Sequence, residues 1–281
     1  MLTANRCYQQ NKKMTKVTGI VVHSTVANNK TLKRYVQPIK ADKDYTAIMN
    51  DLGTNLYGNH WNKASASVCV HAFIGTNKKG EVETYQTLPW DICCWGVGSG
   101  KKGSYNYNPT ARIQFEICED NRKDVNYFNK AFKEAIELCA YLCKKHNLTV
   151  DKICSHSEAY KAGYGSNHGD PEHWMKKFGK DMDWFRDEVE ELLTGKHTAK
   201  AYSGTFPTLP SRGYFKNGDK GTQVKNLQMF LNWCLGNCLA VDGIIGGNTT
   251  AAVKVFQRHY GLAVDGLFGK DSLAKAKTIK K

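Results

Sequence analysis

The chain has 281 residues, of which 41% are hydrophobic and 11% aromatic, and its net charge is +14. This length exceeds what one compact core usually organises, so we expect two units joined by a linker. The apolar content excludes a disordered or fibrous protein.

Four segments have the apolar, β-branched pattern of strands, at residues 17–22, 68–74, 81–85 and 112–118, and a shorter one lies at 153–155. A long amphipathic helix is predicted from Asp124, a suitable N-cap, to His146, and it should cover one face of the sheet. Another helix is expected at 182–193. This alternation predicts an α/β fold with a mixed central sheet flanked by helices.

A change of composition separates the two units. Between Leu193 and Gly213 the chain has two prolines, two glycines and no apolar periodicity, which predicts domains at 1–194 and 213–281 with a linker at 195–212. In the second domain AVDGIIG (240–246) recurs as AVDGLFG (263–269). Each Asp-Gly supplies a turn between helices, so we expect a small all-α, three-helix domain.

The positive charge is concentrated at the end of the chain. Residues 196–281 contain 13 Lys and Arg against 4 Asp and Glu, a net charge of +9. Such a surface favours an anionic partner, whether a nucleic acid, a membrane surface or a cell-wall polymer.

The ten cysteines do not form a recognisable framework. The chain begins MLTANRCYQQNKKM, without the apolar segment of a secretion signal, and no stretch approaches the ~18 apolar residues of a membrane span. We therefore expect a protein made in the cytosol, with no stable membrane insertion, whose cysteines are thiols. Cys139 and Cys143, like Cys234 and Cys238, are spaced as on a helix, not as in a zinc knuckle.

Polar groups follow several predicted strands. His23 comes directly after GIVV, His156 after ICS, and Glu116 lies near the end of RIQFEIC. Ligands of open α/β sheets bind beside the carboxyl ends of the strands, so a shared crevice is expected there. The loop SNHGDP brings His168 and Asp170, and its turn-forming residues suit a segment that folds over this crevice.

These residue types suit zinc catalysis. His23, His156 and Asp170 would provide three protein ligands and leave a fourth position open. Glu116 would then transfer the proton, and His168 would assist the developing oxyanion. Each residue alone has an ordinary structural explanation, and Asp170 before a proline is also a normal start of a helix.

Several segments resemble the type 2 N-acetylmuramoyl-L-alanine amidases, the family of many phage endolysins. They are VVHST (21–25), VHAFIG (70–75), NPTARIQFEICED (108–120) and SHSEAYKAGYGSNHGDPEHW (155–174), and the resemblance covers most of residues 14–194. It implies zinc-dependent hydrolysis of the amide between N-acetylmuramic acid and L-alanine in bacterial peptidoglycan. The alternative is a peptidoglycan recognition protein that binds this fragment without cutting it.

The resemblance also assigns roles. It implies Zn²⁺ bound by His23, His156 and Asp170, with Glu116 as the catalytic base. The residue two before the third ligand is usually a lysine, and here it is His168. His168 would either assist the oxyanion or compete with Asp170 for the metal, and we favour Asp170 as the ligand.

Other assignments are weaker. No G-x-S-x-G motif supports a serine hydrolase, and Cys154 near His156 supports a cysteine hydrolase poorly. The Gly-rich stretch from Trp95 to Tyr107 suits a cleft wall, where Trp95 would contact substrate or pack internally. His71 points toward the site in the family's arrangement, and we expect a packing or substrate-binding role.

The tail resembles the three-helix peptidoglycan-binding module of many wall hydrolases, in VKNLQMFLN and the two VDG segments. The partners implied are peptidoglycan and possible anionic wall polymers. A nucleic-acid partner has only the net charge in its favour. The resemblance further implies a lytic protein of the host cytoplasm that reaches the wall after holin action or lysis, although a bacterial autolysin remains an alternative.

Overall fold

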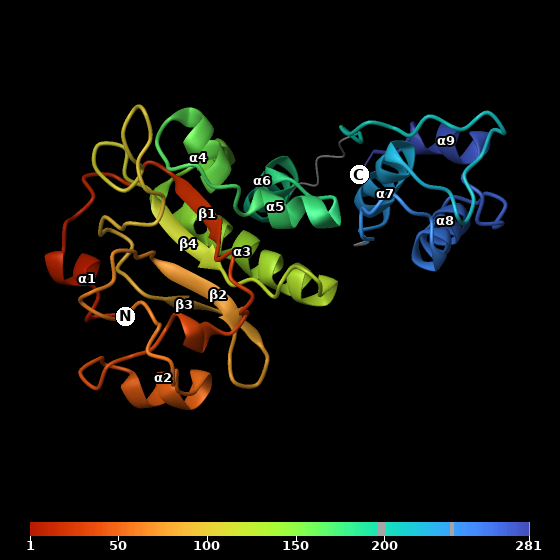
Figure 1. The fold of residues 1–281 in the computed structure, drawn as a ribbon. Helices are drawn as coiled ribbons and strands as arrows, with labels where there is room; N and C mark the ends of the chain where they lie inside the picture. Colours follow the sequence, from red (N-terminus) through yellow and green to blue (C-terminus); the bar gives the residue numbers. More distant parts are fainter. Residues whose placement is uncertain (196–200, 237–238, 281) are drawn as a thin grey trace. The chain divides into compact units, whose positions relative to one another are not determined.

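The structure is a computed structural model that describes residues 1–195, 201–236 and 239–280. It divides into two compact units (Figure 1). The first consists of Met1–His173 and Met182–Thr194, and the second of Trp174–Asp181 and Gly195–Lys281. In the part of the chain that is described, no helix is both long and apolar enough to cross a membrane.

The first unit is built on a five-stranded sheet with the strand order β3-β2-β4-β1-β5. β3 pairs antiparallel with β2, and every other neighbouring pair is parallel, so the predicted mixed sheet is confirmed. β2 begins later than predicted, at Ala72, and Cys69 before it forms an isolated bridge with Trp95. The strands are β1 (Ile20–Ser24), β2 (Ala72–Thr76), β3 (Val82–Gln86), β4 (Ile113–Ile117) and β5 (Ile153–Ser155).

The helical segments before residue 195 include the two predicted ones, α3 and α6. Asp124 caps α3 as expected, because its side chain accepts hydrogen bonds from the backbone N–H groups of Asn126 and Tyr127. The shorter helices were not predicted, since few turns give little periodicity to detect. The segments are α1 (Arg6–Gln10), η1 (Leu32–Arg34), α2 (Tyr45–Leu52), α3 (Val125–His146), η2 (Val150–Lys152), α4 (His156–Ala162), α5 (Glu172–Met175), η3 (Lys176–Phe178) and α6 (Met182–Thr194).

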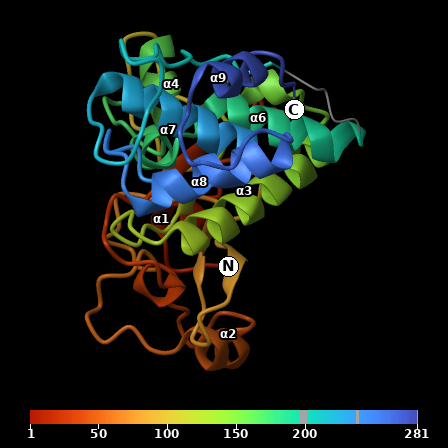
Figure 2. The ribbon, with the colours of Figure 1, turned by 90° about the vertical axis from the view of Figure 1, so that its right-hand side faces the viewer.

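Helix α3 covers one face of the sheet (Figures 1 and 2). Thr84 of β3 donates a hydrogen bond to Glu134 of α3, 2.8 Å away, so the side chain of Thr84 and of its partner Ile74 face this helix. Side chains alternate along a strand, which places Phe73 on the opposite face. Phe73 is in register with Glu116, so both share the face away from α3.

A disulfide bond between Cys7 and Cys69 corrects the expectation that all cysteines are thiols. The two residues are 62 positions apart, and no motif links them in the sequence. Proximity arises because Asn5, the N-cap of α1, donates hydrogen bonds to the carbonyls of Trp61 and Val68 and so holds α1 against this loop. Seven cysteines of the described residues are free, and Cys238 lies outside the described residues.

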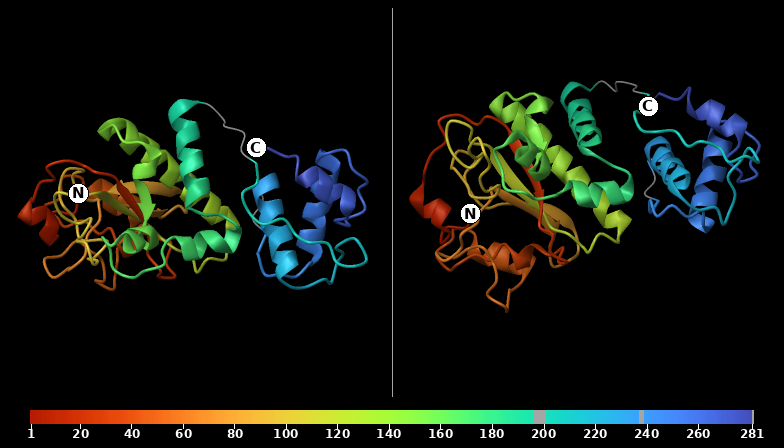
Figure 3. Two further views of the ribbon diagram at one scale, coloured as in Figure 1. Left: turned by 90° about the horizontal axis from the view of Figure 1, so that it is seen from above. Right: turned by 45° about the horizontal axis from the view of Figure 1, so that its top comes forward.

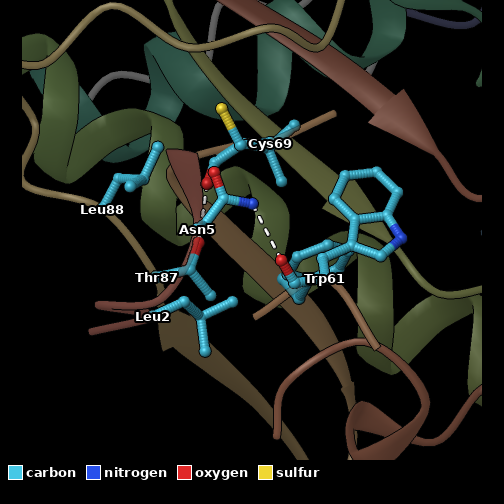
Figure 4. A pocket seen from close by; sticks show the side chains of 8 residues that line it. Leu2, Asn5, Trp61, Cys69, Thr87 and Leu88 are labelled. Atoms are coloured by element: carbon cyan, nitrogen blue, oxygen red, sulfur yellow. Dashed lines mark hydrogen bonds between the residues drawn. The ribbon is translucent and has the colours of Figure 1, made fainter. Parts of the chain in front are cut away.

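The packing beside the disulfide is tight. Asn5, Trp61 and Cys69 line a crevice together with apolar side chains from the N-terminus and β2 (Figure 4). The crevice leaves no space for a water molecule. It is therefore part of the core of this unit, not a ligand site.

We predict that reducing this disulfide destabilises the protein. Closing a loop of this length restricts the unfolded chain, and the loop-entropy relation gives a loss of about 4 kcal/mol at most when the bond is broken. Urea unfolding with and without reductant measures the change. The Cys7→Ser/Cys69→Ser double variant is the control, because its stability should not respond to reductant. Equal stability of the wild-type protein in both conditions would contradict a stabilising role.

The second unit contains the three helices α7 (Thr222–Leu235), α8 (Gly247–His259) and α9 (Lys270–Ala276) around one apolar core (Figure 3). Phe230, Phe256 and Phe268 are fully buried at its centre. Tyr202 and Phe206, expected in the linker, pack against this core, so the chain joins the second unit before residue 213. Residues 196–200 of the expected linker lie outside the described residues.

The internal repeat has a structural cause. The side-chain amide of Gln228 in α7 donates hydrogen bonds to Asp242 Oδ1 and to the carbonyl of Ile244. Its side-chain oxygen, Oε1, accepts from the N–H of Gly243. Gln257 of α8 makes the same three bonds to the second Asp-Gly turn, with Asp265, Gly266 and Leu267. Each helix thus fixes the turn that leads into the next one, as the turns predicted at both Asp-Gly pairs require.

Candidate functional site

Three buried side chains converge at one edge of the sheet. His23 lies in β1, His156 begins α4, and Asp170 precedes α5. The Nδ1 atoms of the two histidines are 3.0 Å apart, and the carboxylate of Asp170 lies 3.3 Å from Nδ1 of His23 and 3.4 Å from Nδ1 of His156. None of the three is more than 4% exposed. Of the described residues, they alone form a group whose ligand atoms are close enough to hold one ion.

The topology explains this convergence. β1 lies between β4 and β5 and is parallel to both, so the three carboxyl ends share one edge of the sheet. β5 stops at Ser155, which forms a reciprocal cap with Glu158 and so starts α4 at His156. The candidate ligands therefore lie beside the carboxyl ends of the strands, as expected.

The donor set fits a zinc ion. Two imidazole nitrogens and one carboxylate oxygen match the three protein ligands of catalytic zinc sites. Both histidines present Nδ1 to the shared point, while their Nε2 atoms lie 3.1 Å from Gln114 Oε1 and 3.2 Å from Ser166 Oγ. Such outer partners are usual for metal-binding histidines, because they fix the orientation and tautomer of the ring.

Asp170 is held as a carboxylate. Burial opposes its ionisation, but hydrogen bonds from His156 and His23 outweigh this effect and keep the pKa of Asp170 well below its usual range. The backbone N–H of Ser24 also donates to Asp170 Oδ2, at 3.3 Å. The third candidate ligand therefore has the negative charge that a divalent cation requires.

Glu116 lies beside this group. It is in register with His23 on the neighbouring strand β4, so both side chains are on the same face. Glu116 is 9% exposed, and among the described residues its Oε2 has no hydrogen-bond partner. Burial, with the negative charges of Asp170 and Glu119, raises the pKa of Glu116 well above its ordinary value. A carboxylate made more basic in this way suits a proton-transfer role.

Glu119 is a buried support of the site that the sequence analysis missed. Its Oε1 accepts hydrogen bonds from Ser24 Oγ at 2.6 Å and from the N–H of Val26, and it lies 2.8 Å from His173 Nε2. The hydrogen bond to Glu119 raises the pKa of His173. Glu119 therefore links the end of β1, which carries His23, to the segment that follows Asp170. An acidic pair directly after a strand was the only available signal.

Two nucleophilic side chains near the site, Ser24 and Cys154, are not placed for attack. The hydroxyl of Ser24 donates its hydrogen bond to Glu119, and not to a histidine that could act as its general base. Burial raises the pKa of the Cys154 thiol to about 11, so the thiolate that a cysteine hydrolase needs is disfavoured. The arrangement favours metal-assisted hydrolysis over covalent catalysis.

Comparison with known families bears on the same residues. Residues 13–173 match the family described as N-acetylmuramoyl-L-alanine amidase, which is more than half of the chain. This chain belongs to the N-acetylmuramoyl-L-alanine amidase family. Residues 220–275 match a second family, described as a putative peptidoglycan binding domain. The family resemblances of both predicted domains are thus confirmed.

Individual amidases share different portions of this chain. The amidase CwlL of Bacillus licheniformis is 34% identical over 164 residues, which are 57% of this chain and 43% of CwlL. CwlA of Bacillus subtilis (strain 168) is 25% identical over 283 residues, or 93% of this chain and 98% of CwlA. The Staphylococcus aureus hydrolase AmiA, solved with its ligand, has a TM-score of 0.42 at 19% identity and covers 63% of this chain and 73% of AmiA. The chain spans less than half the length of the first of these relatives.

In this amidase-family domain His168 lies at the rim of the site. It is exposed, its Nδ1 is 3.0 Å from Ser166 Oγ, and its ring centre is 4.6 Å from that of His156. Among the described residues it is not part of the group that could hold one ion. Its assistance to an oxyanion stays a prediction.

His71 and Trp95, the expected substrate contacts, occupy different environments. His71 has no exposed surface; Nε2 donates to the carbonyl of Ile92, and Nδ1 accepts from the N–H of Gln114. No part of this imidazole is accessible to a substrate in the structure. Trp95 is half-buried and packs beside the disulfide, with Arg6 over its ring. A substrate contact by Trp95 stays a prediction.

We predict that His71 makes the stability of the amidase-family domain depend on pH. Burial lowers the pKa of His71 to about 4, from an ordinary value of 6.5. Between pH 6.5 and pH 4, His71 is therefore protonated in the unfolded chain but neutral in the folded protein. The stability that is present above pH 6.5 is thus lost as the pH falls toward 4. Unfolding free energies of the wild type should drop by about 2 kcal/mol more between pH 7 and 4.5 than those of His71→Asn. Parallel curves would contradict this.

Proposed function

We propose that this protein is a zinc-dependent N-acetylmuramoyl-L-alanine amidase, which hydrolyses the amide between the lactyl group of N-acetylmuramic acid and L-alanine in peptidoglycan. The convergence of His23, His156 and Asp170 beside Glu116 carries the proposal. Membership of the amidase family and the second match to a putative peptidoglycan binding domain support it.

The residues would divide the work as follows. His23, His156 and Asp170 hold the zinc ion, which when bound polarises a carbonyl and makes water acidic enough to attack near neutral pH. Glu116 accepts the proton of the attacking water and delivers it to the leaving amine of L-alanine. The water oxygen bonds to the carbonyl carbon as the C–N bond breaks, which leaves a carboxylic acid and a free amine. His168, exposed at the rim, donates a hydrogen bond to the oxyanion.

The reaction is tested on suspended peptidoglycan, with and without a chelator. Amino groups should appear without a matching rise in reducing sugars, because an amide is cut and no glycosidic bond is. Chelation should abolish their release, and added Zn²⁺ should restore it. Binding to walls without any release of amino groups would support a recognition protein instead.

Two site variants separate metal binding from proton transfer. Glu116→Gln should keep bound zinc but lose activity by about 100-fold or more, since a general base typically contributes at least that factor. His23→Ala should lose both zinc and activity. Glu137→Gln, which changes a half-exposed carboxylate on α3, is the matched control. A fully active Glu116→Gln enzyme would overturn the assigned base.

The second unit would hold the enzyme on its insoluble substrate, which raises the local concentration of the catalytic unit without further catalytic contacts. Its net charge of +9 over residues 196–281 suits anionic wall polymers. Raising the salt from about 50 to about 500 mM should therefore weaken wall binding more than it slows cleavage of a soluble muropeptide. Co-sedimentation measures the binding. Walls stripped of anionic polymers are the control, and an equal salt effect on both kinds of wall would argue against this partner.

The biological setting is part of the same proposal. The resemblance of the catalytic motifs to those of phage endolysins supports a lytic role, with release from the host cytoplasm through a holin or by lysis. Action on the wall after release would then complete host-cell lysis.

A further inference from the structure

The Gly-rich stretch after Trp95 has a use beyond forming a cleft wall. Its Gly96-Val97-Gly98 segment lies against Gln114 and Ser166, which contact the two candidate zinc-binding histidines. Val97 has no exposed surface; its N–H donates to Asn106, which also accepts from Gln114, and its carbonyl accepts from Ser166. None of the proposed catalytic steps uses this segment.

One chain of hydrogen bonds leads from Val97 to His23. The N–H of Val97 donates to Asn106 Oδ1 at 3.2 Å, and Gln114 Nε2 donates to the same oxygen at 2.9 Å. Gln114 Nε2 also donates to the carbonyl of Tyr105, and Gln114 Oε1 lies 3.1 Å from His23 Nε2. Gln114 is fully buried.

The polarity of this chain is fixed at its ends. A backbone N–H can only donate and a backbone carbonyl can only accept, so Val97 and Tyr105 together orient the amides of Asn106 and Gln114. The side-chain oxygen of Gln114, Oε1, must then face His23. His23 can donate a hydrogen bond to this oxygen only with a proton on Nε2. His23 Nδ1 is therefore the nitrogen that faces Asp170 and His156, and the one that a metal ion would bind.

A second chain leads from Val97 to His156. The carbonyl of Val97 accepts from the N–H of Ser166 at 2.9 Å and from Ser166 Oγ at 3.1 Å. A serine hydroxyl has one proton, and Ser166 Oγ lies 3.0 Å from His168 Nδ1 as well as 3.2 Å from His156 Nε2. With its proton on the Val97 carbonyl, Ser166 Oγ can accept from both imidazoles, which leaves His156 with a proton on Nε2 and with Nδ1 toward His23.

The two glycines make this close approach possible. A Cβ atom at Gly96 would lie 2.5 Å from Gln114 Oε1, and a Cβ atom at Gly98 would lie 2.7 Å from Ser166 Oγ. Gly98 also has a φ of +68°, which side chains rarely adopt. Each glycine thus leaves room for one of the two residues that contact a histidine.

We propose that Gly96-Val97-Gly98 acts as a positioning segment, which through Gln114 and Ser166 holds both histidines with protonated Nε2 and with Nδ1 free to bind the metal. The inference rests on the proposed zinc site but concerns how the protein prepares it. Gln114 and Ser166 are positioning residues, since they act through His23 and His156.

The test combines zinc affinity with the tautomers of the histidines. Competition with a chromophoric chelator gives the Kd for Zn²⁺, and long-range ¹H–¹⁵N NMR of metal-free, histidine-labelled protein reports which ring nitrogen is protonated. The wild type should show Nε2–H at both histidines. Gln114→Met should lose this preference at His23 alone and Ser166→Ala at His156 alone, each with a Kd about 10- to 100-fold weaker.

A further variant separates positioning from folding. Gly96→Ala leaves Gln114 in the sequence but displaces its oxygen, so it should reproduce the loss even if Gln114→Met does not fold. Gly247→Ala, where a Cβ meets nothing within 4 Å, is the matched control.

The outcomes distinguish the two proposals. A wild-type protein that binds no zinc would refute the proposed zinc site. A wild type that binds zinc, with wild-type Kd and tautomers in Gly96→Ala and Ser166→Ala, would overturn the positioning role and leave the zinc site standing.

Discussion

Two imidazole nitrogens and a carboxylate, buried within 3.4 Å of one another, are costly to desolvate unless positive charge lies among them. The rest of the catalytic unit can be understood from this constraint. Three parallel strand ends bring the groups together, and the cap at Ser155 sets the start of α4 so that His156 turns inward. A divalent cation would satisfy all three groups at once, so their arrangement supports the proposed metal site.

The same constraint determines the surroundings of the site. A buried histidine is a dependable metal ligand only if its other nitrogen has a partner, because otherwise either tautomer is possible. Gln114 and Ser166 supply these partners, and Glu119 ties the end of β1 to the segment after Asp170. Glu116 differs from these groups, since its Oε2 lacks a partner among the described residues. The groups around the site therefore have hydrogen-bond partners, whereas Glu116 keeps an oxygen that is available to accept a proton.

The sequence predicted what depends on local pattern. The strands, α3 with its cap at Asp124, and the meeting of His23 with His156 follow from periodicity and from the rule that parallel strands share their carboxyl ends. The roles of Gln114 and Ser166 could not be predicted, because no fixed sequence spacing relates a buried amide or hydroxyl to the histidine that it orients. The Cys7–Cys69 bond was missed for a similar reason, since it depends on a loop closed by hydrogen bonds of Asn5.

In the second unit, side-chain amides of glutamine likewise fix the orientation of neighbouring groups. Gln228 and Gln257 each bind one Asp-Gly turn, because the amide donates to the aspartate carboxylate and accepts from the glycine N–H. Gln114 likewise uses both ends of its amide, donating toward Asn106 and accepting from His23. A glutamine amide carries a donor and an acceptor that cannot be exchanged without rotating the group. In the turns this polarity fixes the backbone, and beside His23 it would determine which ring nitrogen is available to a metal ion.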